Sequence, residues 1–180
     1  ALRTPEGTTV DLAGESGRRL YLDPALDALA ERDPAMAEAR ERARALIAAV
    51  ARRGATLLRI ARHLALVQPA PFAGDRAGLR PLTRLEVAQT LGLHPATVGR
   101  AVADKAIDID GRLVPLTAFF TARLDGADGQ PVAAAAARDR IAALIASEPP
   151  EAPLSDARLC ALLRAEGVDM ARRTVAKYRQ

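Results

Sequence analysis

The sequence of 180 residues contains one cysteine, no tryptophan and only five other aromatic residues. A single cysteine, Cys160, excludes an internal disulfide and a cysteine-based metal site, and it is typical of a protein of the reducing cytosol. With so few aromatics, the hydrophobic cores must be built from Leu, Ile, Val and Ala. An aliphatic, alanine-rich composition favours helices over strands, so we expect a mostly helical fold.

Long hydrophobic runs are also missing. No stretch of 18 apolar residues occurs, so we expect no membrane-spanning helix. The first residues, 1–5, lack the apolar core of a signal peptide and an initiator methionine. We therefore expect a cytoplasmic protein and a chain that is part of a longer one.

Motifs for chemistry are scarce as well. The chain has two histidines and no glycine-rich phosphate loop, nucleophile elbow, His-Glu-x-x-His or cysteine pair. His63 and His94 are expected to be structural, and Asp108 with Asp110 has no His or Glu nearby to complete a metal site. We predict no enzyme activity, no catalytic residue, no metal and no cofactor.

The positive charge of the chain is concentrated at its end. Of 26 basic and 22 acidic residues, which give a net charge of +4, the last ten residues contain four cations and no acid. The preceding 170 residues therefore sum to zero. The four cations are Arg172, Arg173, Lys177 and Arg179.

The spacing of Ala171, Val175 and Tyr178 predicts that this segment is a helix with a narrow inward stripe, from which the four cations project. Asp169 is the expected N-cap. An exposed basic helix suits the DNA major groove, where Arg binds guanine while Lys, Thr174 and the Tyr178 hydroxyl reach phosphates. The alternative is a solvated C-terminal helix whose cations interact with the negative end of its dipole.

The apolar spacing over residues 33–68 predicts a long amphipathic helix, which would be about 50 Å long if unbroken. Asp33 and Pro34 supply an N-cap and a first-turn proline, and no proline follows until Pro69. The apolar spacing fails at Arg53, beside Gly54, which predicts a local weakness. A coiled-coil arm that dimerises is the alternative. The apolar positions of the pattern are Met36, Ala39, Ala43, Leu46, Val50, Leu57, Ile60, Leu64 and Val67.

The segments on either side of this helix are weakly patterned. Before it, Arg19–Leu22 resembles a strand, and Asp23 with Pro24 starts a short helix over residues 25–30. After it, residues 69–82 hold five prolines and glycines and predict a linker.

Residues 83–101 fit a helix-turn-helix. Thr83 and Glu86 form a capping box, Ala88 is small where the helices cross, Gly92 suits a turn with positive φ, and Val98 packs the second helix on the first. His94 or Pro95 opens that second helix. Its outward residues are Ala96, Thr97, Gly99, Arg100 and Ala103. An ordinary helical hairpin is the alternative.

A small β-hairpin is expected over residues 107–114, followed by Phe119 and Phe120 in the core. Residues 125–131 predict a flexible linker, and residues 132–180 a three-helix unit. Its first helix spans 132–147. Its second opens at 154–156 and turns inward Leu159, Leu162 and Leu163. Gly167 then turns the chain into the basic helix.

The run Ala171-Arg172-Arg173-Thr174-Val175-Ala176-Lys177-Tyr178-Arg179 closely resembles the RpoN box of the sigma-54 family of bacterial transcription initiation factors. Nine consecutive positions match, and Gln180 stands where the family usually has Glu. The helix-turn-helix resembles that of the family too, with Ala96-Thr97-Val98-Gly99-Arg100 in place of the usual Ser-Thr-Val-Ser-Arg.

The resemblance implies four regions. Residues 1–32 would end a core-binding region or linker, and 33–124 would hold an extra-long helix plus helix-turn-helix. Residues 125–131 would be a linker, and 132–180 the promoter-binding domain with the RpoN box. The implied fold is therefore mostly α, with a long helix, a helix-turn-helix module with a small β-hairpin, and a separate three-helix domain.

The resemblance also implies a function in the bacterial cytoplasm, at the nucleoid. Such factors direct core RNA polymerase to promoters with GG and GC elements, at −24 and −12, and need an AAA+ ATPase activator that acts through regions outside this sequence. Arg172, Arg173 and Lys177 would read the GG element, and Thr97 and Arg100 would lie near the GC element. The other predicted DNA-binding residues are Thr174, Tyr178, Arg179 and Ala96. A stand-alone helix-turn-helix repressor and a helical interaction scaffold stay open as alternatives.

Overall fold

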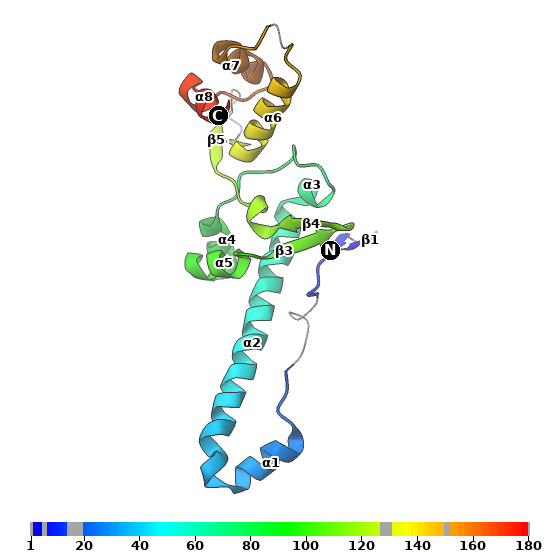
Figure 1. Cartoon of the computed structure of the whole chain (residues 1–180), viewed down its shortest axis with the longest axis vertical. Coiled ribbons are helices and arrows are strands. Elements are labelled where there is room, and N and C mark those ends of the chain that lie inside the picture. Colours follow the sequence, from blue (N-terminus) through cyan, green and yellow to red (C-terminus); the bar gives the residue numbers. More distant parts are fainter. Residues whose placement is uncertain (1, 5–6, 14–19, 127–130, 150–151, 180) are drawn as a thin grey trace.

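The computed structural model describes residues 2–4, 7–13, 20–126, 131–149 and 152–179. These ranges contain eight α-helices, one 3-10 helix and three two-stranded antiparallel sheets (Figure 1). The prediction of a mostly α fold is confirmed. Among the described helices, none combines the length and the hydropathy that crossing a bilayer requires.

A long helix, α2 (Pro34–Val67), runs from one end of the molecule to the body that contains the remaining elements (Figure 1). Asp33 caps it by accepting a hydrogen bond from the Ala35 amide at 2.9 Å. The helix is continuous over 34 residues, so the predicted weakness near Gly54 does not break it. A single glycine costs a helix only about 1 kcal/mol relative to alanine, and so many flanking helical residues outweigh that cost.

The apolar stripe of α2 is buried only near its C-terminal end, where Ile60 and Leu64 are fully buried. Towards the other end, the side chains of Leu46 and Val50 are 62% and 39% exposed. The heptad pattern therefore marks one face correctly, but only its second half packs against the body.

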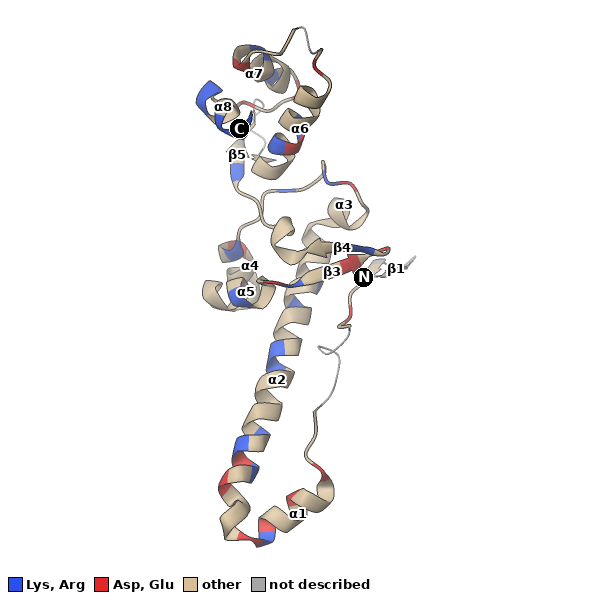
Figure 2. Cartoon of the chain, viewed as in Figure 1, with Lys and Arg blue, Asp and Glu red and all other residues tan. Residues whose placement is uncertain are grey.

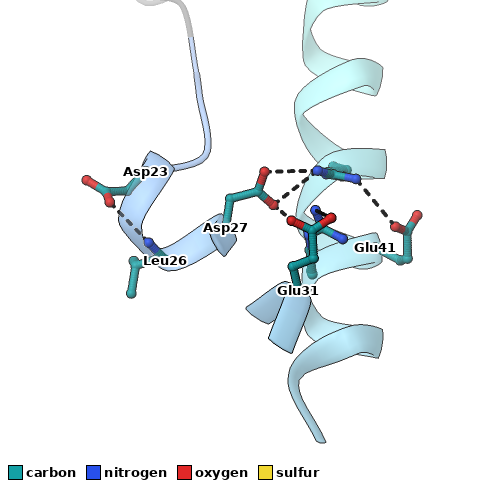
Figure 3. A network of polar contacts seen from close by, with 7 residues as sticks. Asp23, Leu26, Asp27, Glu31 and Glu41 are labelled. Atoms are coloured by element: carbon teal, nitrogen blue, oxygen red, sulfur yellow. Dashed lines mark hydrogen bonds and ion pairs between the residues drawn. The ribbon is translucent and has the colours of Figure 1, made fainter. Parts of the chain in front are cut away.

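At its free end, α2 packs against the short helix α1 (Pro24–Arg32), which Asp23 caps as predicted. The carboxylate of Asp27 on α1 accepts hydrogen bonds from Arg40 Nε at 2.6 Å and Arg44 Nη2 at 2.9 Å (Figure 3). These hydrogen bonds, that from Arg40 first, lower the pKa of Asp27 below its ordinary value. The two helices are thus joined by an ion-pair network at the surface.

The N-terminal segment contains a hairpin that the sequence pattern did not indicate. Strands β1 (Leu2–Thr4) and β2 (Gly7–Thr9) pair antiparallel. Val10 is buried in the core of the body, and its carbonyl accepts from Arg62 Nε at 3.3 Å. The strand predicted over Arg19–Leu22 was wrong for Leu20–Leu22, which form no strand, and Arg19 lies outside the described residues.

The first module surrounds the C-terminal end of α2. It comprises α3 (Pro69–Phe72), α4 (Arg84–Leu91), α5 (Pro95–Val102), β3 (Ala106–Ile109), β4 (Arg112–Pro115) and the 3-10 helix η2 (Leu116–Phe119). The predicted hairpin is confirmed. Asp110 and Gly111 both have positive φ, 50° and 83°, as the tightest hairpin turns require. The ring of Phe119 is buried against Phe72, with the centroids 4.9 Å apart.

Residues 69–82 are packed rather than a free linker, which corrects the prediction. The buried amide of Gln68 donates to the carbonyls of Arg80 and Phe119, at 2.7 and 3.2 Å, and accepts from the Arg80 amide at 2.9 Å. Because a buried amide must find partners, these bonds hold the segment against the module.

The second module comprises β5 (Arg123–Asp125), β6 (Pro131–Ala133), α6 (Ala134–Ala146), α7 (Asp156–Ala165) and α8 (Arg172–Arg179). The first helix begins two residues later than predicted because Val132 lies in β6. Strands β5 and β6 pair, and Gly126 bridges to Val168, so both ends of the segment predicted as a flexible linker are held. Residues 127–130 lie outside the described residues. The division into domains stays a prediction.

The core of this module is aliphatic, as expected. Its buried residues are Ala137, Ile141, Leu144, Leu159, Leu163, Val168, Met170 and Val175. The inward positions of Leu159 and Leu163 are confirmed, Leu162 is half-buried beside them, and Cys160 packs against the same cluster.

Candidate nucleic-acid interface

Helix α8 begins at Arg172. The carbonyl of Ala171 accepts from the amides of Thr174 and Val175, at 2.8 and 3.1 Å, so Ala171 takes the position before the helix. Two predictions were therefore wrong. Ala171 is exposed and outside the inward stripe, and Asp169 is no N-cap, because its carboxylate accepts instead from Arg164 Nη2 at 2.7 Å. Met170 is buried in place of Ala171.

The inward side of α8 is anchored by Val175, which is fully buried between the other two helices. Tyr178 is half-buried on the same core, and the guanidinium carbon of Arg138 lies 5.4 Å from its ring centroid. The Tyr178 ring therefore helps to hold α8 against the core.

The outward side of α8 carries three exposed cations, Arg172, Arg173 and Lys177 (Figure 2). None of them forms an ion pair with a residue that the structure describes. Arg173 and Lys177 are four positions apart and therefore share a face of the helix. Arg172 lies about 100° around the helix from Arg173, at a hollow that it lines with residues of α7.

The position of Arg172 and Arg173 argues against a merely solvated helix. They lie in the first turn of α8, which contains no acidic residue. That turn is the positive end of the helix dipole, where a cation is disfavoured by about 0.3–1 kcal/mol at low ionic strength. Only Lys177 and Arg179, in the last turn, have the favourable arrangement. The N-terminal turn of α8 is thus suited to an anionic partner.

Arg179 does not project into solvent, which corrects the prediction. Its Nη1 donates to the Leu154 carbonyl at 2.6 Å and to Asp156 Oδ1 at 3.2 Å, and its Nη2 lies 3.8 Å from Glu148 Oε1. The side chain is 31% exposed. It ties the end of α8 to the start of α7 and to the connection before it.

The second candidate element is the α4–α5 pair, whose predicted helix caps and turn are confirmed. Thr83 and Glu86 form a reciprocal capping box, and Gly92 has a φ of 63°. His94 caps α5, its Nδ1 accepting from the Ala96 amide at 3.2 Å. Val98 is fully buried against α4.

The outer surface of α5 is less basic than that of α8. Ala96 and Arg100 are exposed, whereas Thr97 and Gly99 are half-buried. Arg100 forms no ion pair with the described residues. One cation on two turns offers fewer contacts to an anionic polymer than the three of α8.

The arrangement brings both candidate helices to one side of the molecule. In the view of Figure 2, α5, β5 and α8 follow one another along the same edge. The sequence pattern indicated the two helices separately. It did not indicate the arginines that lie between them, such as Arg123 on β5. Within the described ranges, no group of three or more His, Cys, Asp or Glu side chains is placed to bind a metal ion.

Comparison with known proteins identifies relatives of this chain. The family model described as the DNA-binding domain of sigma-54 matches residues 34–180. An RNA polymerase sigma-54 factor of Xanthomonas euvesicatoria is 42% identical over 123 residues, which cover 68% of this chain and 26% of the relative. The factor of Escherichia coli is 34% identical over the same shares of both chains. The chain thus spans about a quarter of the length of these relatives.

A solved structure has a similar fold. It is sigmaN of Aquifex aeolicus, bound to promoter DNA, with a TM-score of 0.54 and 24% identity over 89% of this chain and 48% of that one.

Proposed function

Because the chain belongs to the sigma-54 family, we propose that it binds promoter DNA through two recognition helices, as part of a factor that directs core RNA polymerase. Helix α8 enters the major groove at a GG element, with Arg172, Arg173 and Lys177 as its contacts. Helix α5 lies near a GC element, with Thr97 and Arg100 facing the DNA and Ala96 beside them. Elements about one helical turn apart, at −24 and −12, present both grooves to one face of the protein.

The observation that carries the proposal is the first turn of α8. Its two arginines, Arg172 and Arg173, are exposed, without a described ion-pair partner, and at the positive end of a helix. A guanidinium binds O6 and N7 of guanine with two parallel hydrogen bonds, which suits a GG step. Arg179 serves a different role, holding the far end of α8. Thr174 lies beside the reading face, and Tyr178, whose ring packs on the core, reaches a phosphate only through its hydroxyl.

The first test is fluorescence-anisotropy binding of the whole chain to a duplex with both elements and to one in which the GG is replaced, at two salt concentrations. We expect preference for the GG duplex to persist at the higher salt. Equal, salt-sensitive binding would instead indicate a generic basic helix, and absence of binding would favour an interaction scaffold.

Single substitutions separate base reading from phosphate binding. Arg173→Ala should weaken binding to the GG duplex by about 1–3 kcal/mol and reduce discrimination at one guanine, if Arg173 is a bidentate reader. An equal loss on both duplexes would mean a phosphate contact. Arg32→Ala, which removes an exposed charge from the end of α1, is the matched control and should leave the discrimination unchanged.

Contact with core RNA polymerase is the other part of the proposal, and the exposed apolar side chains at the free end of the molecule support it. Leu26 and Leu29 on α1 are 56% and 55% exposed, and Leu46 on α2 is 62% exposed. Exposed leucines on two adjoining helices suit a surface that a protein partner covers. A Leu46→Ser variant should retain its fold and DNA binding but bind purified core polymerase less well. Unchanged polymerase binding would contradict this assignment, and no binding by the unaltered chain would favour a stand-alone repressor.

An AAA+ ATPase activator belongs to the same proposal, through regions outside this sequence. The chain itself is then expected to bind DNA in the same way with and without that activator.

A further inference from the structure

A groove lies where the two modules meet, and arginines line it. It is about 390 Å³ in volume and is lined by Arg80, Pro81, Leu82, Thr83, Glu86, Arg123 and Pro131. The segment before α4 and the first turn of α4 form one wall, and the β5–β6 pair forms the other.

A short backbone bridge explains why distant residues meet there. The Leu82 amide donates to the Thr121 carbonyl at 3.1 Å, and the Thr121 amide donates to the Leu82 carbonyl at 3.0 Å. In an antiparallel bridge, positions two residues before one partner and two after the other lie opposite each other on the same face. The bridge thus brings Arg80 and Arg123, each two residues from a bridged position, into the lining of one groove, which sequence reasoning had no means of predicting.

The groove has an excess of positive charge. Two arginines of the lining, Arg80 and Arg123, are exposed, and neither forms an ion pair with a described residue. The one acid in the lining, Glu86, accepts from the Thr83 amide at 2.6 Å and its hydroxyl at 2.8 Å. These hydrogen bonds, and secondarily the charge of Arg123, lower the pKa of Glu86. One oxygen of its carboxylate, Oε2, is therefore held by the capping box.

We propose that Arg80 and Arg123 bind backbone phosphates of the DNA that runs between the elements contacted by α5 and α8. The proposal rests on the proposed function. It is supported by the position of β5 between α5 and α8 along one edge of the molecule (Figure 2). Guanidinium groups bind phosphates without regard to sequence, so these contacts orient both helices on one duplex.

The test compares two duplexes and two pairs of substitutions in the whole chain. One duplex carries both elements, and a shorter one carries the GG element alone. The variant is Arg80→Ala with Arg123→Ala. The control is Arg52→Ala with Arg53→Ala, which removes the same charge from exposed positions midway along α2.

The measured quantity is the dependence of the binding constant on salt. Each phosphate contact contributes about 0.9 to the slope of log K against log salt concentration, so the double variant should lose about 1.8 on the long duplex. Between 50 and 200 mM salt, the unaltered chain should then lose roughly twelvefold more affinity than the variant. The short duplex and the control should show no such change.

An unchanged slope on the long duplex, or an equal loss on both duplexes, would overturn the proposal. Replacing both arginines by lysine should restore the slope, because a phosphate needs only a positive charge there. Failure of lysine to restore it would assign the arginines a structural role. A lack of GG preference in the unaltered chain would refute the proposed function, while the slope would still decide the phosphate contacts.

Discussion

The last helix, α8, contains two kinds of cation. Arg179 is held by contacts within the protein, whereas the other three are exposed, and replacing Arg179 tests this distinction. The substitution is Arg179→Ala. The structure predicts that it destabilises the second module while leaving the number of phosphate contacts unchanged. A DNA-contacting arginine would behave in the opposite way.

The magnitude follows from the contacts of the guanidinium. It donates to the Leu154 carbonyl at 2.6 Å and to Asp156 at 3.2 Å, and it approaches Glu148, whose side chain is 17% exposed. Hydrogen bonds with charged groups contribute about 1.5–3 kcal/mol, and the 31% exposure of Arg179 places this set at the low end. We expect a loss of about 1.5–2 kcal/mol, which corresponds to a decrease in Tm of about 3–8 °C for a chain of this size.

The assay pairs thermal unfolding with the salt dependence of DNA binding, and Lys177→Ala is the matched control. Lys177 is exposed, on the same helix, and forms no ion pair with the described residues. Its substitution should leave the free energy of unfolding within about 0.5 kcal/mol and lower the salt slope by about 0.9. Arg179→Ala should show the reverse, with lower stability and an unchanged slope. A stable Arg179→Ala variant with a reduced salt slope would refute the reasoning and return Arg179 to the DNA-binding set.

Three further predictions concern single residues at a turn, inside a helix and between two helices. Gly92→Ala should destabilise the first module by about 1–2 kcal/mol by thermal unfolding, because the φ of 63° is strained for any residue with a Cβ even though open space surrounds the position. Gly99→Ala should instead stabilise it by about 1 kcal/mol, since this glycine lies inside α5 with open space around it, and a loss would show an unseen close contact. Asp27→Asn should speed amide hydrogen exchange over residues 24–32 without changing DNA binding. Because the pKa of Asp27 is lowered below its ordinary value, the same loss of protection is expected in the unaltered chain only as pH falls through that lowered pKa. Protection that is lost already above the ordinary carboxyl pKa, measured relative to the intrinsic exchange rate, would contradict it.

Local signals predicted the individual helices well because each depends on a few neighbouring residues. Asp33 and Pro34 start α2, Thr83 with Glu86 starts α4, and Gly92 ends it, all through backbone groups within four positions. The same holds for the turn of the β3–β4 hairpin, which needs positive φ at two adjacent residues. These elements were predictable because their causes are local in the sequence.

The errors arose where contacts between elements, which the local sequence pattern does not show, decided the outcome. Asp169 has the right chemistry for an N-cap, but Arg164 on α7 holds its carboxylate. Residues 69–82 have the composition of a linker, but the buried amide of Gln68 binds them to the module. Periodicity predicted inward positions along all of α2, but the body covers only its C-terminal part.

The sequence by itself determined that the chain is helical, that its excess charge is gathered in one terminal helix, and that this helix resembles the signature of a known family. It could do so because composition, helical spacing and local capping are properties of short segments. Only the tertiary structure decided which cations of that helix are available. Arg179 is held by groups 23 and 25 residues earlier, whereas Arg172, Arg173 and Lys177 have no described ion-pair partner. It also brought Arg80 and Arg123 to one groove, because the position of a side chain relative to distant groups depends on how the elements pack.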